Sequence, residues 1–119
     1  MSVLLVSPDL MIQSRVAAAA SRAGLPSPRV ISWQDIPTLE GVDSYRLLIV
    51  DLASPGMDID QTIAALRERR DESAPIIAFA PHVHTAKLAV AREAGCDQVL
   101  SRGQFDREIE AMVQRLADR

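Results

Sequence analysis

The sequence is poor in cysteine and has no long apolar runs. Its 119 residues include a single cysteine, Cys96, so an internal disulfide is excluded and a reducing compartment is expected. No apolar run approaches the ~20 residues that a transmembrane helix needs, and the start of the chain lacks the basic segment and cleavage site of a secretion signal. We therefore expect a cytoplasmic protein with no membrane partner.

Excess positive charge is also missing. Lysine and arginine number 13 against 16 aspartates and glutamates, for a net charge of −3, whereas nucleic-acid binding relies on a concentrated basic surface. The densest basic run, residues 67–70, is followed at once by Asp71 and Glu72. We interpret it as the solvated end of a helix, and we expect no nucleic-acid partner.

Clusters of metal-binding side chains are absent as well. The two histidines, His82 and His84, have no second group of cysteine or histidine at ligand spacing. We interpret them as surface residues of a loop. Cys96 follows Gly95 at the entrance to a predicted strand, where a small apolar thiol packs well.

The sequence instead contains short apolar runs that alternate with helical periodicities, a pattern typical of repeated βα units. Strands are expected at residues 3–6, 30–32, 46–51, 76–80 and 98–101. The length allows one domain, residues 1–119, and right-handed crossovers then favour a three-layer α/β sandwich around a parallel sheet of order 2-1-3-4-5.

Five helices are expected between and after these strands. The first stops at Gly24 and has one apolar face, made of Ile12, Val16, Ala19 and Ala23, and the second is weak because Pro37 limits its length. The third begins at Asp58, with Gln61 in a capping-box spacing, and buries Ile59, Ile63 and Leu66. The fourth runs from about Thr85 to Gly95, and the last is capped by Asp106 and buries Ile109, Val113 and Leu116. Trp33 is expected to cover the end of the second strand, with a partner surface as the alternative.

The most informative segment is the run Leu47-Leu48-Ile49-Val50-Asp51, which a Ser-Pro-Gly turn follows. A strand without polar alternation belongs to a parallel sheet covered on both faces, and ligands collect beyond the carboxyl ends of such strands. Asp51 is therefore predicted to be a functional carboxylate at that edge.

Two motifs carry a resemblance to a known family. Asp51 is followed by Pro55-Gly56-Met57-Asp58, and residues 91–97, Ala-Arg-Glu-Ala-Gly-Cys-Asp, lead into the last strand. The chain resembles, over essentially its whole length, the receiver domain of bacterial two-component response regulators. The resemblance implies a flavodoxin-like fold and a non-enzymatic role in a phosphorelay, with Asp51 phosphorylated by a histidine kinase. It also implies a protein target on the surface of the helix at 85–95, strand 98–101 and the last helix.

The sequence departs from the family pattern at the positions that support Asp51. The family's acidic pair, which holds Mg²⁺, corresponds to Ser7 and Pro8 in this chain. The family's hydroxyl residue, which binds the phosphoryl group, corresponds to Ala80, and its aromatic switch residue corresponds to Val99. The family's lysine and the proline after it correspond to Arg102 and Gly103. Arginine keeps the positive charge in a larger, planar group. We expect Arg102 to form a salt bridge with Asp51.

The same departures weaken the implied Mg²⁺ site. Mg²⁺ requires hard oxygen ligands in octahedral geometry, and proline offers no side-chain oxygen. Asp51 and Asp9 are the remaining candidate ligands, although Asp9 also fits the N-cap of the first helix.

Three functions stay open at this point. The first is a receiver domain with Asp51 as phosphoacceptor, and the second is a pseudo-receiver that binds partners or forms a homodimer without phosphorylation. The third, a flavin carrier or small-molecule enzyme, is disfavoured because residues 7–9, Ser-Pro-Asp, remove a backbone donor and add negative charge where a phosphate would bind.

Overall fold

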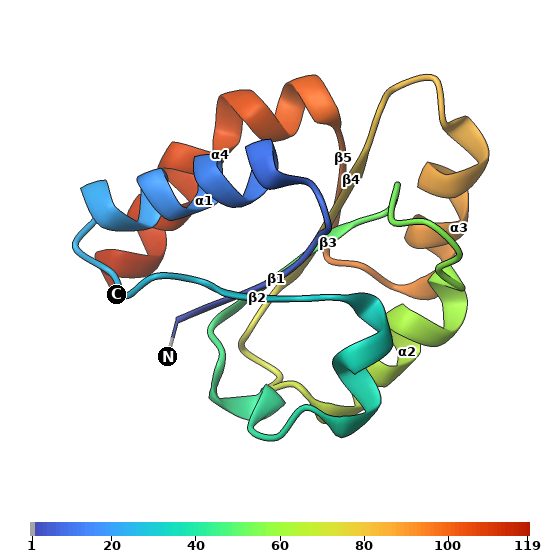
Figure 1. Ribbon diagram of the computed structural model, residues 1–119, viewed down its shortest axis with the longest axis horizontal. Coiled ribbons are helices and arrows are strands. Elements are labelled where there is room, and N and C mark those ends of the chain that lie inside the picture. Colours follow the sequence, from blue (N-terminus) through green and yellow to red (C-terminus); the bar gives the residue numbers. More distant parts are fainter. Residues whose placement is uncertain (1) are drawn as a thin grey trace.

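The computed structural model describes residues 2–119 and contains a five-stranded parallel sheet (Figure 1). Its strands are β1 (Val3–Val6), β2 (Arg29–Ile31), β3 (Leu47–Asp51), β4 (Ile76–Ala80) and β5 (Gln98–Ser101). All neighbouring strands pair in parallel, in the order β2-β1-β3-β4-β5. The predicted flavodoxin-like sheet is confirmed.

Helices cover both faces of this sheet. The α-helices are α1 (Leu10–Arg22), α2 (Ile59–Arg69), α3 (Thr85–Ala94) and α4 (Arg102–Ala117). Figure 1 shows α1 and α4 together on one face, with α2 and α3 on the other. None of these helices, within residues 2–119, has both the length and the apolar character needed to cross a bilayer.

The core has two halves because successive strand residues point to opposite faces. In β1, Val3 and Leu5 pack toward α1 and α4, whereas Leu4 and Val6 pack toward α2 and α3. The same alternation holds along β3 and β4, whose ten residues are all buried. On the α1–α4 side, the rings of Phe79 and Phe105 stack with centroids 4.2 Å apart.

The predicted second helix is replaced by two short 3₁₀ helices, η1 (Trp33–Thr38) and η2 (Val42–Ser44). Ser32 caps η1 through a capping box with Asp35, and Pro37 lies inside it. Arg69 of α2 donates hydrogen bonds to the carbonyl oxygens of Ile36 and Leu39, at the end of η1. A proline-containing segment too short for an α-helix is thus fixed by a neighbouring side chain.

The basic run at residues 67–70 is the end of α2, as interpreted, and Arg67 and Glu68 are exposed, but Arg69 and Arg70 are half-buried. Besides the contacts of Arg69, Arg70 donates to Asp97 and to the carbonyl of Ala74, and Arg67 donates to the carbonyl of Ala94. The basic run therefore connects α2 to three neighbouring segments.

The start of the last helix is a second correction. Asp106 is not its N-cap, because α4 begins at Arg102, a turn earlier than predicted. Ser101 caps it: its hydroxyl accepts from the backbone N–H of Gln104, and the Gln104 side chain accepts from the N–H of Ser101. The Ser-x-x-Gln spacing is a better capping sequence than the one we chose. The buried face of Ile109, Val113 and Leu116 is confirmed.

Candidate functional site

Asp51 is the last residue of β3 and lies at the carboxyl edge of the sheet, 4% exposed. Its Oδ2 accepts a hydrogen bond from the Ser7 hydroxyl at 2.7 Å, and its Oδ1 accepts one from the backbone N–H of Ala53 at 3.0 Å. Ser7 directly follows β1, the strand beside β3, and is buried as well. Both carboxylate oxygens of Asp51 are thus engaged by neutral donors.

The turn after Asp51 is fixed by its own side chains. The buried Ser54 hydroxyl donates to the carbonyl of Asp51 at 2.7 Å, and Gly56 takes a positive φ of 73° that favours glycine. The indole N–H of Trp33 donates to the carbonyl of Pro55 at 3.0 Å. Trp33, which is predicted to cover the end of β2, packs half-buried against the core on the α2–α3 side and holds the turn that follows Asp51.

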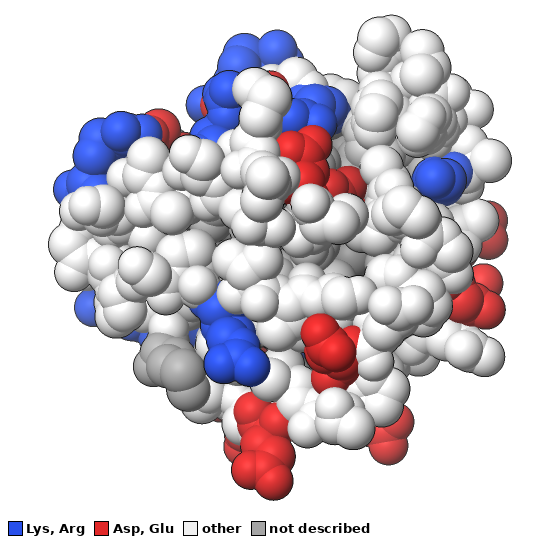
Figure 2. Space-filling model, in the orientation of Figure 1, with Lys and Arg blue, Asp and Glu red and all other residues white. Residues whose placement is uncertain are grey.

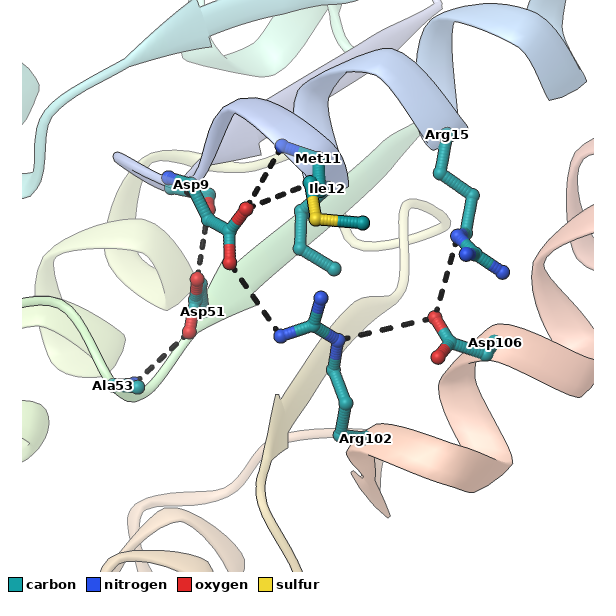
Figure 3. Close-up of polar contacts among 9 residues, drawn as sticks. Asp9, Met11, Ile12, Arg15, Asp51, Ala53, Arg102 and Asp106 are labelled. Atoms are coloured by element: carbon teal, nitrogen blue, oxygen red, sulfur yellow. Dashed lines mark hydrogen bonds and ion pairs between the residues drawn. The ribbon is translucent and has the colours of Figure 1, made fainter.

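Asp9 is the N-cap of α1, as expected. Its Oδ1 accepts hydrogen bonds from the backbone N–H groups of Met11 at 2.8 Å and Ile12 at 3.2 Å. Its other oxygen, Oδ2, lies 3.5 Å from Nη1 of Arg102. Figure 3 shows the Arg102 side chain extending from the start of α4 toward Asp9 at the start of α1.

Arg102 also contacts Asp106 one turn along α4, with Nε 3.9 Å from Oδ1. The same Asp106 oxygen lies 3.5 Å from Nε of Arg15 in α1. The expected salt bridge between Arg102 and Asp51 is wrong: among residues 2–119, the ion pairs of Arg102 are with Asp9 and Asp106. Asp51 instead has the neutral donors Ser7 and Ala53 as its hydrogen-bond partners.

The other positions singled out in the sequence lie around the same edge or beside it. Ala80 ends β4 and is fully buried, and Val99 in β5 packs half-buried against the core on the α2–α3 side. His82 is exposed in the loop after β4. His84 precedes α3 and is half-buried, with no hydrogen-bond partner for its buried Nδ1 in the described structure.

Cys96 is half-buried before β5, and burial raises the pKa of its thiol to about 11. The negative charge of Asp97 adds to this rise, and Arg67 and Arg70 oppose it. The thiol therefore stays protonated and poorly nucleophilic at neutral pH.

Sequence reasoning missed two features of this site. The Ser7–Asp51 hydrogen bond depends on which residues of β1 and β3 end at the same level, and the sequence does not show strand register. The Arg102–Asp106 contact had a readable signal, an i,i+4 pair of opposite charge, but we had placed Asp106 at the helix start instead. Within residues 2–119, no three His, Cys, Asp or Glu side chains are grouped in a way that could hold a metal ion.

No protein-family model matches the chain, and no curated protein matches it. Solved structures do match. The receiver domain of the TMAO respiratory system response regulator TorR is 22% identical, with a TM-score of 0.77, over 97% of this chain and 94% of that one. The receiver domain of sensor histidine kinase PA1611 from Pseudomonas aeruginosa, with magnesium coordinated in its active-site cleft, is 18% identical, with a TM-score of 0.73, over 99% and 98%.

A third similar structure is described as a pilus assembly protein (cpaE) from Burkholderia thailandensis. It is 18% identical, with a TM-score of 0.69, and the match covers 100% of this chain and 99% of that one. Identities at this level establish a common fold and leave activity and partners open. Residues 2–119 therefore form a domain with the receiver fold.

Proposed function

We propose that this domain is a receiver-type signalling module that acts through protein contacts and does not cycle through phosphorylation of Asp51. The observation that carries the proposal is the state of the Asp51 carboxylate, whose two oxygens accept hydrogen bonds from Ser7 and Ala53. A phosphoryl group added to Oδ2 would displace the Ser7 hydroxyl from a buried position. Phosphoryl transfer also requires stabilisation of the moving charge, and Arg102, at the position of the family's lysine, pairs with Asp9 and Asp106 instead of Asp51.

The residues at this edge do not fit a magnesium ion. Mg²⁺ is held by carboxylate and other hard oxygen atoms in near-octahedral geometry. Here Pro8 offers no side-chain oxygen, and Ser7 supplies a neutral hydroxyl whose proton is directed at Asp51. Asp9 already uses one oxygen for the start of α1 and the other for Arg102. The similar PA1611 domain holds magnesium, whereas among residues 2–119 of this chain no three His, Cys, Asp or Glu side chains are grouped to hold a metal ion.

Three further features support a protein-binding role without a phosphorylation switch. Ala80 has no hydroxyl with which to bind a phosphoryl group, and Val99 has no aromatic ring to reorient. The surface formed by α3, β5 and α4 includes the edge strand β5, whose four residues are exposed or half-buried. We propose this surface as the contact for a cytoplasmic protein target or for a second copy of the chain.

The helix that follows β1 also disfavours a nucleotide or flavin. A helix N-terminus can bind a phosphate through its free N–H groups. In this chain the Asp9 carboxylate already accepts from the N–H groups of Met11 and Ile12. A phosphate would have to displace a negatively charged group to bind there.

One observation favours the second candidate, a receiver domain that is phosphorylated by a histidine kinase. Asp51 ends β3 at the carboxyl edge, in a fold shared with magnesium-binding receiver domains. A direct measurement of phosphorylation therefore separates the two candidates.

The deciding experiment is intact mass spectrometry after incubation with a small-molecule phosphodonor and magnesium. The wild-type protein and Asp51→Asn are compared, and a receiver domain known to be labelled serves as the positive control. We expect the wild-type mass to stay unchanged under conditions that label the control. A gain of one phosphoryl group by the wild type, absent from Asp51→Asn, would establish the second candidate in place of the first.

A further inference from the structure

Four charged side chains link the start of α1 to the start of α4, and we name them the α1–α4 ion chain: Asp9, Arg102, Asp106 and Arg15. The three contacts along it are 3.5 Å, 3.9 Å and 3.5 Å, with Arg102 and Arg15 alternating with the two aspartates. Figure 3 draws the whole series, and Figure 2 shows acidic and basic atoms side by side over this part of the surface.

Arg102 occupies the central position of this ion chain. Its guanidinium lies between two carboxylates that belong to different helices, and its side chain is only 34% exposed. Nε of Arg102 and Oδ1 of Asp106 are buried and have no hydrogen-bond partner in the described structure. These two atoms of opposite charge lie 3.9 Å apart, and their attraction reduces the cost of burying them.

We infer that the Arg102 guanidinium is the resident counter-charge of this edge, that it keeps magnesium away from Asp9, and that it connects α1 to α4. The inference rests on the proposed function and deepens it, because it names the residue that excludes magnesium from this edge. The repulsion is direct: a divalent cation bound by Oδ2 of Asp9 would have to sit beside a guanidinium that is already 3.5 Å from that oxygen.

The first test is a titration with magnesium chloride, followed by calorimetry and by the fluorescence of Trp33, the only tryptophan. Trp33 is suited to this because its indole contacts Pro55, four residues after Asp51. The proteins are wild type, Arg102→Gln, and Arg107→Gln as the matched control, which removes the same charge from an exposed position of α4.

We expect no saturable binding by the wild type or Arg107→Gln at millimolar magnesium. Arg102→Gln should bind at least about tenfold more tightly than the limit set for the wild type, because a unit charge has been removed from beside the carboxylates. Saturable submillimolar binding by the wild type, or equal magnesium affinity in Arg102→Gln and Arg107→Gln, would overturn the inference.

The second test addresses the connection between the helices. Asp9→Asn removes the charge and retains a good N-cap residue, so α1 should keep its start. In a double-mutant cycle with Arg102→Gln, the two effects on stability should be non-additive, and amide exchange in the first turn of α1 should accelerate similarly in both single variants. Additive effects would show that the two side chains are not coupled and would reject the connection.

The two proposals fail in different ways. A wild-type protein that binds magnesium tightly but gains no phosphoryl mass would remove the role of Arg102 and leave the proposed function standing. A wild-type protein that is phosphorylated at Asp51 without saturable magnesium binding would reject the proposed function and leave the role of Arg102 standing.

Discussion

The Ser7 hydroxyl donates a 2.7 Å hydrogen bond to Oδ2 of Asp51 across the ends of two neighbouring strands. The two residues are 2% and 4% exposed, so water cannot replace either partner. A buried acceptor that loses its donor suffers the full cost of desolvation. The Ser7–Asp51 hydrogen bond therefore stabilises the carboxyl edge of the sheet and also occupies one oxygen of the candidate phosphoacceptor.

Replacing Ser7 by alanine should lower the free energy of unfolding by about 1–3 kcal/mol, because Oδ2 of Asp51 would be left buried and unsatisfied. Urea unfolding measures this change. Ser14→Ala is the matched control, since Ser14 is an exposed residue of α1 and its replacement should change stability little. Equal stability of the two variants would mean that the Ser7–Asp51 hydrogen bond contributes nothing.

The position of Asp51 could be predicted from the sequence, whereas its partners could not. A continuous apolar run that ends in a carboxylate identifies a buried parallel strand and its carboxyl edge. The contact with Ser7 depends on register between strands, and the contact between Asp9 and Arg102 joins residues 93 positions apart. Neither relationship leaves a local pattern in the chain.

Arg69→Ala should destabilise the protein by about 1–3 kcal/mol, because two carbonyls at the end of η1 lose a charged donor. Arg69→Lys should recover only part of this loss, since a single ammonium does not reproduce the planar fork of a guanidinium. Glu68→Ala, at an exposed neighbouring position, is the control. If Arg69→Ala is as stable as Glu68→Ala, η1 does not depend on this contact.

The errors in reading the helices have local causes. The sequence-based prediction starts the last helix too late because Asp106 is a good N-cap residue by type, while Ser101 and Gln104 form the complete capping box. The partners of the basic run at 67–70 escape prediction because composition does not reveal which carbonyls lie within reach of a long side chain. Both errors concern side-chain partners, and neither changes the strand order.

Two glycines test how far backbone conformation constrains the sequence. Gly95 ends α3 with φ of 98°, and a Cβ there would lie 2.6 Å from Nη1 of Arg67. Gly95→Ala should therefore cost about 1–2 kcal/mol. Gly103 lies in the first turn of α4, where a Cβ would be in ordinary contact with Arg107 at 3.5 Å.

Gly103→Ala is consequently the matched control and should raise stability by about 0.5–1 kcal/mol, because alanine loses less backbone freedom on folding. Thermal and chemical unfolding of both variants give the comparison. If Gly95→Ala is at least as stable as Gly103→Ala, the positive φ of Gly95 does not make alanine unfavourable at that position.

Stability should fall with rising pH in a window set by Cys96. Burial, the largest cause, raises the pKa of its thiol from 9.0 to about 11, so the folded protein keeps a proton that the unfolded chain loses above pH 9. The contribution of the protonated thiol is complete below pH 9 and is lost as the pH rises toward 11.

The measurement is the free energy of unfolding from pH 8 to 11 for wild type and Cys96→Ala, because the difference between the two curves isolates the contribution of the thiol. The wild type should lose stability more steeply across this window. As a second check, the native thiol should hold roughly a hundredfold less thiolate than the unfolded one at pH 8, and alkylation should be correspondingly slower. Parallel curves for the two proteins, together with rapid alkylation of the native thiol, would show that the thiol is not shielded by its surroundings.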